Sequence, residues 1–368
     1  MIIGVPREIK DDENRVGLVP SCVEALVVAG HQVFVESGCA SGIGLSDDDY
    51  SACGAIVLST ATEVWSKSEM IVKVKEPLVS EYGFLRPGLI VFTYFHFAAA
   101  PSLVDVCRTS QAVCIAYETV QSADGQLPLL APMSEVAGRM AVQEGAKYLE
   151  KAMGGRGILL GGVPGVSPAN VVIIGGGMVG TEAAKVAAGM GANVSVLDIS
   201  LARLRYLNDV MPKNVTTLFA NTGTIRDSVV TADLVIGAVL IKGTKAPTLV
   251  PKSLVAKMKA GAVIVDVAVD QGGCVETIRP TTHRDPVYFV DNVLHYGVAN
   301  MPGAVPVTST YALTNATYPY VMRLARLGWK RAVLEDQSLF CGLSFANGAC
   351  YSAEVSEQFG LILMTSLS

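Results

Sequence analysis

The feature that most constrains the fold is a glycine-rich motif at residues 175–180, directly after the β-branched run Val171–Ile174. Gly175, Gly177 and Gly180 give the spacing G-x-G-x-x-G, in which the first glycine permits a tight turn. The second lets the backbone approach a pyrophosphate, and the third lets a helix pack closely on the strand. This order of strand, glycines and helix is typical of a dinucleotide-binding domain.

The residues that follow the motif support the same interpretation. A helix is expected over Thr181–Met190, and its amino-terminal N–H groups would stabilise phosphate charge. Asp198 ends the next expected strand, where its carboxylate can accept hydrogen bonds from both ribose hydroxyls and would repel a 2′-phosphate. The sequence therefore predicts NAD rather than NADP. Arg203 lies nearby, and both a ligand contact and a solvated helix charge are consistent with it.

Short apolar runs alternate with helix-like segments over most of the 368 residues, which is typical of parallel α/β structure. We expect strands near Ile2–Val5, Gln32–Val35, Met70–Val74, Leu89–Thr93 and Ala112–Ala116, then near Val171–Ile174, Asn193–Leu197, Asp233–Ile236 and Ala262–Val265. Helices are expected over Pro20–Ala29, Ser102–Thr109, Met133–Met153 and Ser309–Leu327. A chain of this length has room for two such α/β domains.

We predict two doubly wound parallel-sheet domains. Residues 1–130 plus 305–368 would form a discontinuous substrate domain, because the tail from about residue 305 is too short to fold alone. Residues 131–304 would form a Rossmann NAD-binding domain. The helix Met133–Met153 is long enough to bridge the two domains, and the Gly/Pro-rich loop 154–168 marks either a boundary or a mobile segment.

Composition excludes several classes of protein. Hydrophobic residues make up 51% and charged residues 17%, which argues against disorder, and the net charge of −5 argues against a nucleic-acid partner. The uncharged stretches 87–104 and 157–181 contain prolines or many glycines, so we expect buried strands and loops there and no membrane partner. No secretory leader is apparent at the amino terminus. The eight cysteines form no CxxC pair, which predicts reduced thiols in a cytoplasmic protein and no metal site.

Polar side chains follow several expected strands, at the edge where open parallel sheets bind ligands. Lys75, His96 and Glu118 follow strands of the first series, Asp270 follows one of the second, and Arg15 lies in the charged loop after the first strand. Two cationic side chains can bind the carboxylate of a small anionic substrate, while an imidazole and a carboxylate of the protein can transfer protons. Four of the five have a structural alternative: a solvated charge for Arg15, a core histidine for His96, a turn cap for Asp270, and a helix-end partner for Glu118. These residues by themselves predict an NAD-dependent enzyme that acts on a small acid.

Taken as a whole, the sequence resembles the bacterial-type L-alanine dehydrogenases, a family related to the NAD-binding part of proton-translocating transhydrogenases. The resemblance runs essentially end to end and is carried by GVPREIKDDENRVGLVP (4–20), KVKEP (73–77), FTYFHFAA (92–99), LLAPMSEVAGRMA (129–141), VIIGGGMVG (172–180), DLVIGAVL (233–240), residues 265–283, and VANMPGAVPVTSTYALTNATYPY (298–320). It implies reversible, NAD-dependent oxidative deamination of L-alanine to pyruvate and ammonium. It also implies a homohexamer with the active site in the interdomain cleft.

The resemblance also implies roles for single residues. His96 would be the acid/base with Asp270 as its partner, and Arg15 and Lys75 would bind the substrate carboxylate. Tyr94, Met133 and Asn300 would line the substrate pocket. In addition to the glycines of the motif, the cofactor-binding residues would be Ser134, Met178, Val179, Asp198, Arg203, Val239, Leu240, Val267, Asp270, Arg279, Asn300 and Met301.

Other functions stay open at this point. The chain departs from the family at Ala220, where a serine near the adenine is usual, and at Lys242, where a proline is usual. A transhydrogenase-like subunit or a non-catalytic NAD(H)-binding subunit would keep the same fold. Lys75, His96 and Asp270 together favour a self-sufficient dehydrogenase over both. A pocket built for a methyl group discriminates weakly against hydrogen, so activity on glycine and glyoxylate is a further alternative.

Overall fold

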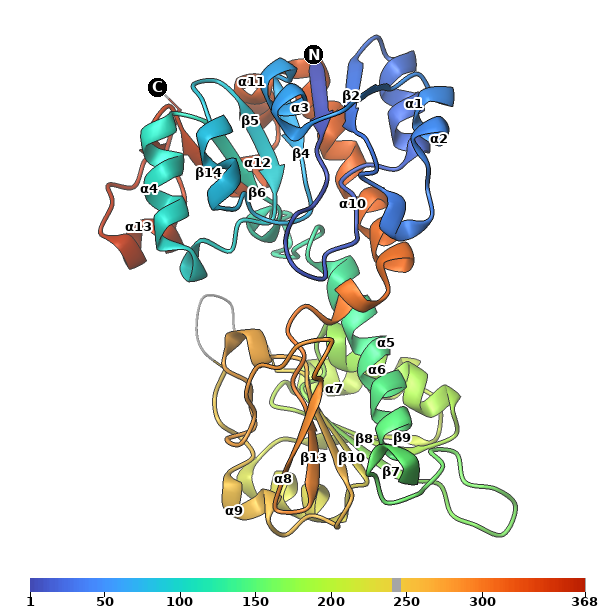
Figure 1. The fold of residues 1–368 in the computed structure, drawn as a ribbon. Coiled ribbons are helices and arrows are strands. Elements are labelled where there is room, and N and C mark those ends of the chain that lie inside the picture. Colours follow the sequence, from blue (N-terminus) through green and yellow to red (C-terminus); the bar gives the residue numbers. More distant parts are fainter. Residues whose placement is uncertain (240–245, 368) are drawn as a thin grey trace. The chain divides into compact units, whose positions relative to one another are not determined.

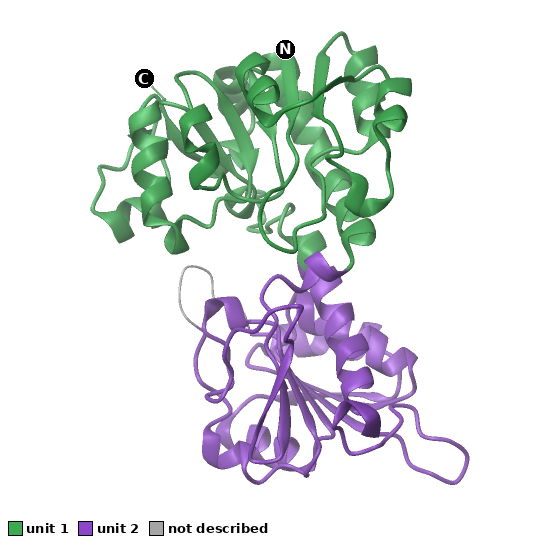
Figure 2. Ribbon diagram, viewed as in Figure 1, with its two compact units in different colours: residues 1–133, 305–368 green, residues 134–304 purple. Residues whose placement is uncertain are grey.

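The computed structural model describes residues 1–239 and 246–367, which form two compact units. Unit 1 comprises Met1–Met133 and Val305–Ser368, and unit 2 comprises Ser134–Ala304 (Figure 2). The loop 154–168 lies entirely within unit 2, so its interpretation as a domain boundary is wrong. The chain passes between the units within helix α5 (Ala131–Tyr148) and again just before helix α10 (Pro306–Leu327).

Unit 1 is built on an eight-stranded sheet in the order β15-β14-β6-β5-β4-β1-β2-β3. The strands from β6 to β3 pair in parallel, and β14 and β15 add antiparallel strands at one edge. Their bounds are β1 (Ile2–Val5), β2 (Gln32–Glu36), β3 (Ile56–Leu58), β4 (Met70–Val72), β5 (Ile90–Thr93), β6 (Val113–Ala116), β14 (Leu343–Ala346) and β15 (Ala349–Cys350). All five predicted first-series strands are confirmed to within two residues at each end.

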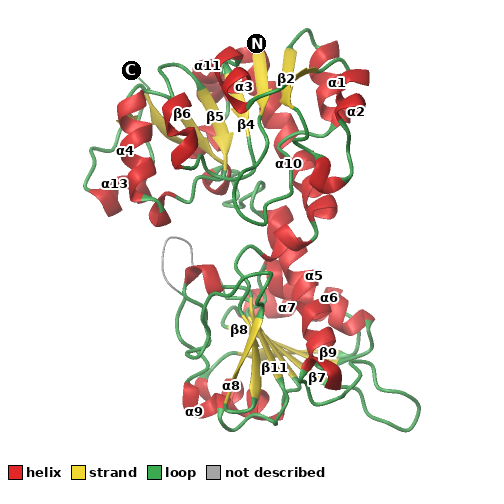
Figure 3. Ribbon diagram, in the orientation of Figure 1, coloured by secondary structure: helices red, strands yellow, loops and turns green. Residues whose placement is uncertain are grey.

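Helices flank this sheet (Figure 3). They are α1 (Pro20–Val28), α2 (Asp47–Ala52), α3 (Ala61–Lys67), α4 (Pro101–Ser110), α10, α11 (Trp329–Glu335), α12 (Gln337–Gly342) and α13 (Ala353–Phe359). The carboxyl-terminal helix α10 packs against α1, and in Figure 1 the orange helix lies beside the blue amino-terminal segments. Segments from both ends of the chain therefore complete one core, which includes Trp65, Phe95 and Phe345.

Unit 2 contains a seven-stranded sheet in the order β12-β13-β11-β10-β7-β8-β9, in which only β12 pairs antiparallel. The strands are β7 (Asn170–Ile174), β8 (Asn193–Asp198), β9 (Val215–Phe219), β10 (Leu234–Gly237), β11 (Val263–Asp266), β12 (Val287–Val290) and β13 (Val293–Tyr296). The helices after α5 are α6 (Met178–Gly189), α7 (Leu201–Val210), α8 (Thr222–Thr231) and α9 (Lys252–Val255). Both sheets are mostly parallel, as the sequence predicts.

Two local details differ from the sequence-based expectation, and a third concerns a hairpin. Helix α5 ends at Tyr148, and a separate 3-10 turn at Lys151–Met153 follows where one continuous helix is expected. Helix α6 begins at Met178, so the last motif glycine lies in its first turn. Asp291 and Asn292 both have positive φ and join β12 to β13 as a tight hairpin, a conformation that Asp and Asn tolerate better than most residues.

The strand orders identify the ligand-binding edge of each sheet. In unit 1 the order reverses between β1 and β4, and in unit 2 it reverses between β7 and β10. Loops that leave the carboxyl ends of such neighbouring strands diverge and leave space for a ligand. The loops after β1 and β4 contain Arg15 and Lys75, and the loop after β7 contains the glycine motif.

Two further findings concern the helices and the cysteines. Within the described residues, none of the helices combines the length and apolar character required to cross a lipid bilayer. All eight cysteines are free thiols, and most of them are buried.

Candidate functional site

Arg15 is a buried cation held by a buried acid. Its side chain is 2% exposed, and its Nε and one terminal nitrogen donate to the Glu13 carboxylate at 2.7 and 2.5 Å. The other terminal nitrogen donates to the Met133 sulfur at 3.0 Å. The interpretation of Arg15 as a solvated charge is therefore wrong, and the residue is brought together with Met133, its predicted neighbour in the pocket. A bound carboxylate would meet a guanidinium already paired with Glu13, and it is a stronger acceptor than the Met133 sulfur.

Lys75 is also buried, with 9% of its surface exposed. Its backbone N–H donates weakly to Glu8 at 3.4 Å, and the structure shows no ion pair of its ammonium within the described residues. Burial, followed by the positive charges of Arg15 and Lys10, lowers the pKa of Lys75. A bound anion would restore the charged form, because opposite charge favours ionisation.

A second buried charge cluster supports the Lys75 loop. The Lys73 ammonium is 2.8 Å from Glu81 and 3.4 Å from Glu8, and all three side chains are almost fully buried. Glu8 also accepts the Val74 N–H at 2.6 Å. The sequence-based interpretation missed Glu8 and Glu13. The only available signal was the density of charges in the loop after the first strand, which does not reveal which charges are buried.

His96 follows β5 in an unusual backbone conformation. Its φ of 49° and ψ of 44° are left-handed, a conformation that costs a non-glycine residue roughly 1–2 kcal/mol. The residue is exposed, so the core-histidine alternative is wrong. Its ring stacks on the Tyr94 ring with centroids 5.7 Å apart. Tyr94 is buried and donates its hydroxyl to the Leu129 carbonyl, so the structure brings Tyr94 and His96 together.

The electrostatic surroundings of His96 favour the neutral imidazole. Desolvation and then the positive charge of Lys75 lower its pKa, while Glu76 opposes them. A neutral histidine near pH 7 can accept a proton and later return it.

In unit 2, the glycine motif has the geometry that a pyrophosphate requires. Gly175 has φ 105°, and a Cβ there would lie 2.5 Å from the Ala238 carbonyl oxygen. A Cβ on Gly180 would collide with the Gly175 carbonyl oxygen, so helix and strand need glycine to pack. At Gly177 a Cβ would meet nothing within 4 Å, which leaves open space beside the amino terminus of α6. Met178 and Val179 form the first turn of this helix, whose N–H groups lack helical partners. The residues present therefore fit a dinucleotide.

Asp198 ends β8 beside this motif. Its carboxylate accepts the Gly176 N–H at 2.7 Å and the Ser200 N–H at 2.8 Å, and it keeps lone pairs for further donors. The Arg203 Nε donates to the Gly176 carbonyl at 2.6 Å, and its guanidinium also reaches the Thr181 hydroxyl at 2.5 Å. Arg203 thus braces the motif, so the solvated-charge alternative is wrong.

The remaining predicted cofactor residues that the structure describes lie on loops after the unit 2 strands or on α5. Asp270, in a 3-10 turn after β11, accepts the Asn300 N–H at a long 3.5 Å, and Asn300 has φ 59°. Val267 donates its N–H to Gly237 at the end of β10, next to the loop residue Val239. Met301 is buried at the start of a 3-10 turn, and Ser134 lies in the first turn of α5. Leu240 and Lys242 lie outside the described residues.

Arg279 is held by Tyr288. The Tyr288 hydroxyl accepts the Arg279 N–H at 2.7 Å, and the Arg279 guanidinium lies 4.1 Å above the tyrosine ring. The other neighbour of this ring is His295, stacked at 5.2 Å, whose Nε2 is 2.7 Å from the Thr277 hydroxyl. His295 is thus a structural residue on β13.

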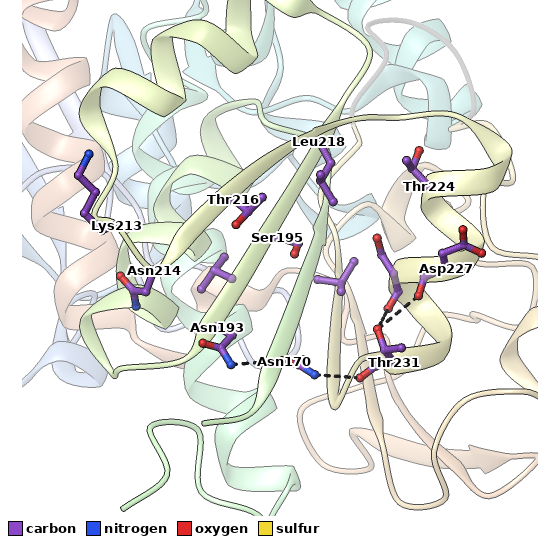
Figure 4. Close-up of a pocket in the computed structure, with 13 residues that line it drawn as sticks. Asn170, Asn193, Ser195, Lys213, Asn214, Thr216, Leu218, Thr224, Asp227 and Thr231 are labelled. Carbon is purple, nitrogen blue, oxygen red and sulfur yellow. Dashed lines mark hydrogen bonds between the residues drawn. The ribbon is translucent and has the colours of Figure 1, made fainter. Parts of the chain in front are cut away.

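Of two cavities in the described residues, one adjoins a predicted site residue and the other does not. A polar cavity of about 580 Å³ in unit 2 includes the first residues of β7 and β8, Asn170 and Asn193, and runs along the sheet beside α8 (Figure 4). It lies away from the glycine motif and is lined mainly by short amides and hydroxyls. A cavity of about 340 Å³ in unit 1 adjoins Arg15 and is lined by Arg7, Glu8, Ile9, Glu13, Asn14, Arg15, Gly38, Cys39, Ser41 and Gly42. This second cavity shows that the carboxyl edge of the unit 1 sheet is hollowed beside the buried arginine.

Known proteins match this chain over almost its whole length. Residues 4–137 match the alanine dehydrogenase/PNT N-terminal domain, and residues 141–353 match the C-terminal domain of the same family. An alanine dehydrogenase of Methanococcus maripaludis is 56% identical over 95% of this chain and 94% of its own. An alanine dehydrogenase of Bacillus subtilis is 52% identical over 98% of this chain and 95% of its own.

Solved structures agree with the sequence matches. A structure of L-alanine dehydrogenase superimposes with a TM-score of 0.95 at 53% identity, covering 98% of this chain and 99% of its own. A transhydrogenase from Sinorhizobium meliloti has a TM-score of 0.81 at 22% identity, covering 96% of this chain and 99% of its own, and shares the fold. On these matches, the chain belongs to the alanine dehydrogenase/PNT family.

Proposed function

We propose that this chain is an NAD-dependent dehydrogenase that converts L-alanine, NAD⁺ and water to pyruvate, ammonium, NADH and a proton, and runs the reverse reaction. Relatives named alanine dehydrogenase that are more than 50% identical over nearly the full chain support this function. The structural observation that carries it is the arrangement in unit 1. Two buried cations and an exposed, left-handed histidine occupy loops at one edge of a parallel sheet.

Arg15 and Lys75 bind the substrate carboxylate. Arg15 is oriented by Glu13, and the substrate carboxylate competes with the Met133 sulfur, a weak acceptor, for the terminal nitrogen that donates to it. Lys75 contributes the net positive charge, because the charge of Arg15 is balanced by Glu13. Holding the carboxylate at two points fixes the Cα hydrogen and removes much of the entropy of encounter. Tyr94 and Met133 form walls of the pocket.

Unit 2 binds NAD through Gly175, Gly177, Gly180 and the first turn of α6. Asp198 binds the ribose, with Arg203 bracing the loop; the remaining contacts come from Ser134, Met178, Val179, Val239, Leu240, Val267, Asp270, Arg279, Asn300 and Met301. When bound, NAD supplies the nicotinamide ring that accepts a hydride from the substrate Cα.

His96 performs the proton transfers that turn the imine into pyruvate. In its neutral form it accepts a proton from the attacking water and then returns it to the departing amine. Asp270 orients the water and stabilises the cationic intermediates. We also propose a cytoplasmic location, supported by the free thiols, and a homohexamer, supported by the family resemblance and the high apolar content.

The decisive experiment follows NADH absorbance with purified protein. L-alanine with NAD, and then pyruvate and ammonium with NADH, should both give turnover. The molar mass, measured by light scattering during size-exclusion chromatography, tests the homohexamer. Binding of NADH, seen as a fluorescence change, with no turnover in either direction would contradict the dehydrogenase and indicate an NAD(H)-binding subunit.

A further inference from the structure

The carboxylate of Glu118 lies beside Phe95 and His96, where the chain leaves the sheet after β5. Strands β5 and β6 are parallel neighbours, with Thr93 opposite Ala116. Continuing this register by two residues places Glu118 beside Phe95. The rings of Tyr94 and Tyr117, one step earlier, pack edge to face with centroids 5.1 Å apart, which shows that the pairing of the two segments continues beyond the strands.

Glu118 takes the place of a missing strand partner. The Tyr94 N–H still donates to Val74, but the next two N–H groups have passed the end of the ladder. Glu118 Oε1 accepts the Phe95 N–H at 3.1 Å and the His96 N–H at 2.7 Å, and Oε2 lies 3.3 Å from the Phe95 nitrogen. One side chain therefore satisfies both backbone donors.

These hydrogen bonds act on a strained residue. His96 is left-handed, a conformation that an L-residue adopts only when its surroundings impose it. After His96 the chain enters the 3-10 turn Phe97–Ala99, so His96 is the point at which the direction changes. An acceptor on the His96 N–H fixes the peptide plane from which the imidazole projects.

We propose that Glu118 is a positioning residue for the dehydrogenase reaction: it holds the Phe95 and His96 N–H groups and thereby sets the imidazole in its working position. This inference rests on the proposed function, because it assigns work to His96. Glu118 does not itself exchange protons with the substrate. Its effect on turnover passes through His96.

Glu118→Gln is the first test. The amide keeps the size of the side chain but removes the charge that strengthens the two hydrogen bonds to Oε1, and its NH₂ group in the place of Oε2 would face the Phe95 N–H as a second donor. Alanine turnover should fall about 10- to 100-fold, since a displacement of about 1 Å at a reacting group has an effect of this size. NADH affinity should stay within about twofold, because unit 2 is unchanged. Glu69→Gln is the matched control: Glu69 also accepts a backbone N–H, that of Ile2 at 2.6 Å, and should leave turnover unchanged.

A double-mutant cycle separates positioning from other roles. In a His96→Ala background, Glu118→Gln should lower the remaining turnover by less than about twofold, because the group it positions is gone. The pH at which kcat/KM falls on the acid side should be the same in wild type and Glu118→Gln. If Glu118→Gln keeps its full effect without His96, or abolishes the acid limb, Glu118 acts independently and the proposal is wrong.

Two further outcomes are distinguishable. A wild-type protein that binds NADH without oxidising alanine would refute the proposed function before Glu118 is tested. If Glu118→Gln does not fold, Glu118→Asp keeps the charge and withdraws the carboxylate from the two N–H groups, and an intermediate loss of turnover is expected. Turnover equal to wild type in a folded Glu118→Asp or Glu118→Gln protein would overturn the proposal.

Discussion

The two units carry their candidate ligand-binding groups at the carboxyl ends of parallel strands but build them from different material. Unit 1 uses buried side-chain charges: Arg15 with Glu13, and Lys73 between Glu8 and Glu81. Unit 2 uses the backbone, with three glycines and the amino terminus of α6. The comparison teaches that a small carboxylate needs localised charge at fixed points. A long dinucleotide can instead be bound by many backbone contacts that need only space.

The largest expected effect tests the unit 1 chemistry. His96→Ala should lower alanine turnover roughly 10²- to 10⁴-fold, the range attributed to a positioned general acid–base. NADH affinity should not change, because the cofactor groups belong to unit 2. Steady-state rates together with NADH fluorescence titration check both statements. A variant with near-normal turnover would remove His96 from the mechanism.

A second prediction compares buried with exposed ion pairs. Lys73→Met leaves Glu8 and Glu81 buried without their cation and should lower the free energy of unfolding by about 3–5 kcal/mol. Lys259→Met is the matched variant in unit 2. There Lys259 lies 2.8 Å from Asp233 but is 32% exposed, and Arg156 also pairs with that acid.

The expected loss for Lys259→Met is at most about 1 kcal/mol. Urea unfolding of both variants gives the two numbers under one set of conditions. Similar losses would show that burial is not what distinguishes the ion pairs of the two units.

A third prediction concerns the backbone site of unit 2. Gly177→Ala meets no neighbouring atom and should fold normally, yet its methyl group would occupy the space beside the amino terminus of α6. We expect the Kd for NADH to rise about tenfold, equivalent to about 1.4 kcal/mol. Gly189→Ala lies in the same helix, also meets nothing within 4 Å, and serves as the control. Unchanged NADH affinity in Gly177→Ala would place the pyrophosphate elsewhere.

The smallest expected effect is a shift of the acid limb of the pH profile to lower pH. The pKa of His96 is lowered, so the neutral form persists below the ordinary histidine value of 6.5. Activity that requires neutral His96 should therefore fall only as the pH drops below about 6.5. The pH profile of kcat/KM for alanine reports this limb for the free enzyme. A limb above pH 7 would mean that a different group, or a His96 with a raised pKa, controls the reaction.

Much of the fold was predictable because local patterns suffice for it. The β-branched run before Gly175 and the expected strand ending at Asp198 were both found in the structure. The strands β14 and β15 were not anticipated. They are short, and their place at the edge depends on pairing with β6, which is more than 200 residues away.

The candidate site was only partly predictable. Strand-end logic selected Arg15, Lys75, His96 and Glu118, and the structure places these four at one edge of the unit 1 sheet. The sequence could not show that Glu118 accepts the His96 N–H, since that contact depends on the register of two strands. The pairing of Glu13 with Arg15 was also not predictable, because nothing in the sequence distinguishes Glu13 from the other charged residues of its loop.

The sequence by itself determined the strand–glycine–helix unit, the alternation of strands and helices, and the types of charged residue at the strand ends. These follow from backbone preference and hydrophobic spacing over a few neighbouring residues. Only the tertiary structure decided which charges are buried, which acid holds which donor, and that His96 is left-handed. Those properties depend on partners that are distant in sequence, as Glu8 is from Val74 and Arg15 is from Met133, and whose contact exists only after the sheet has formed.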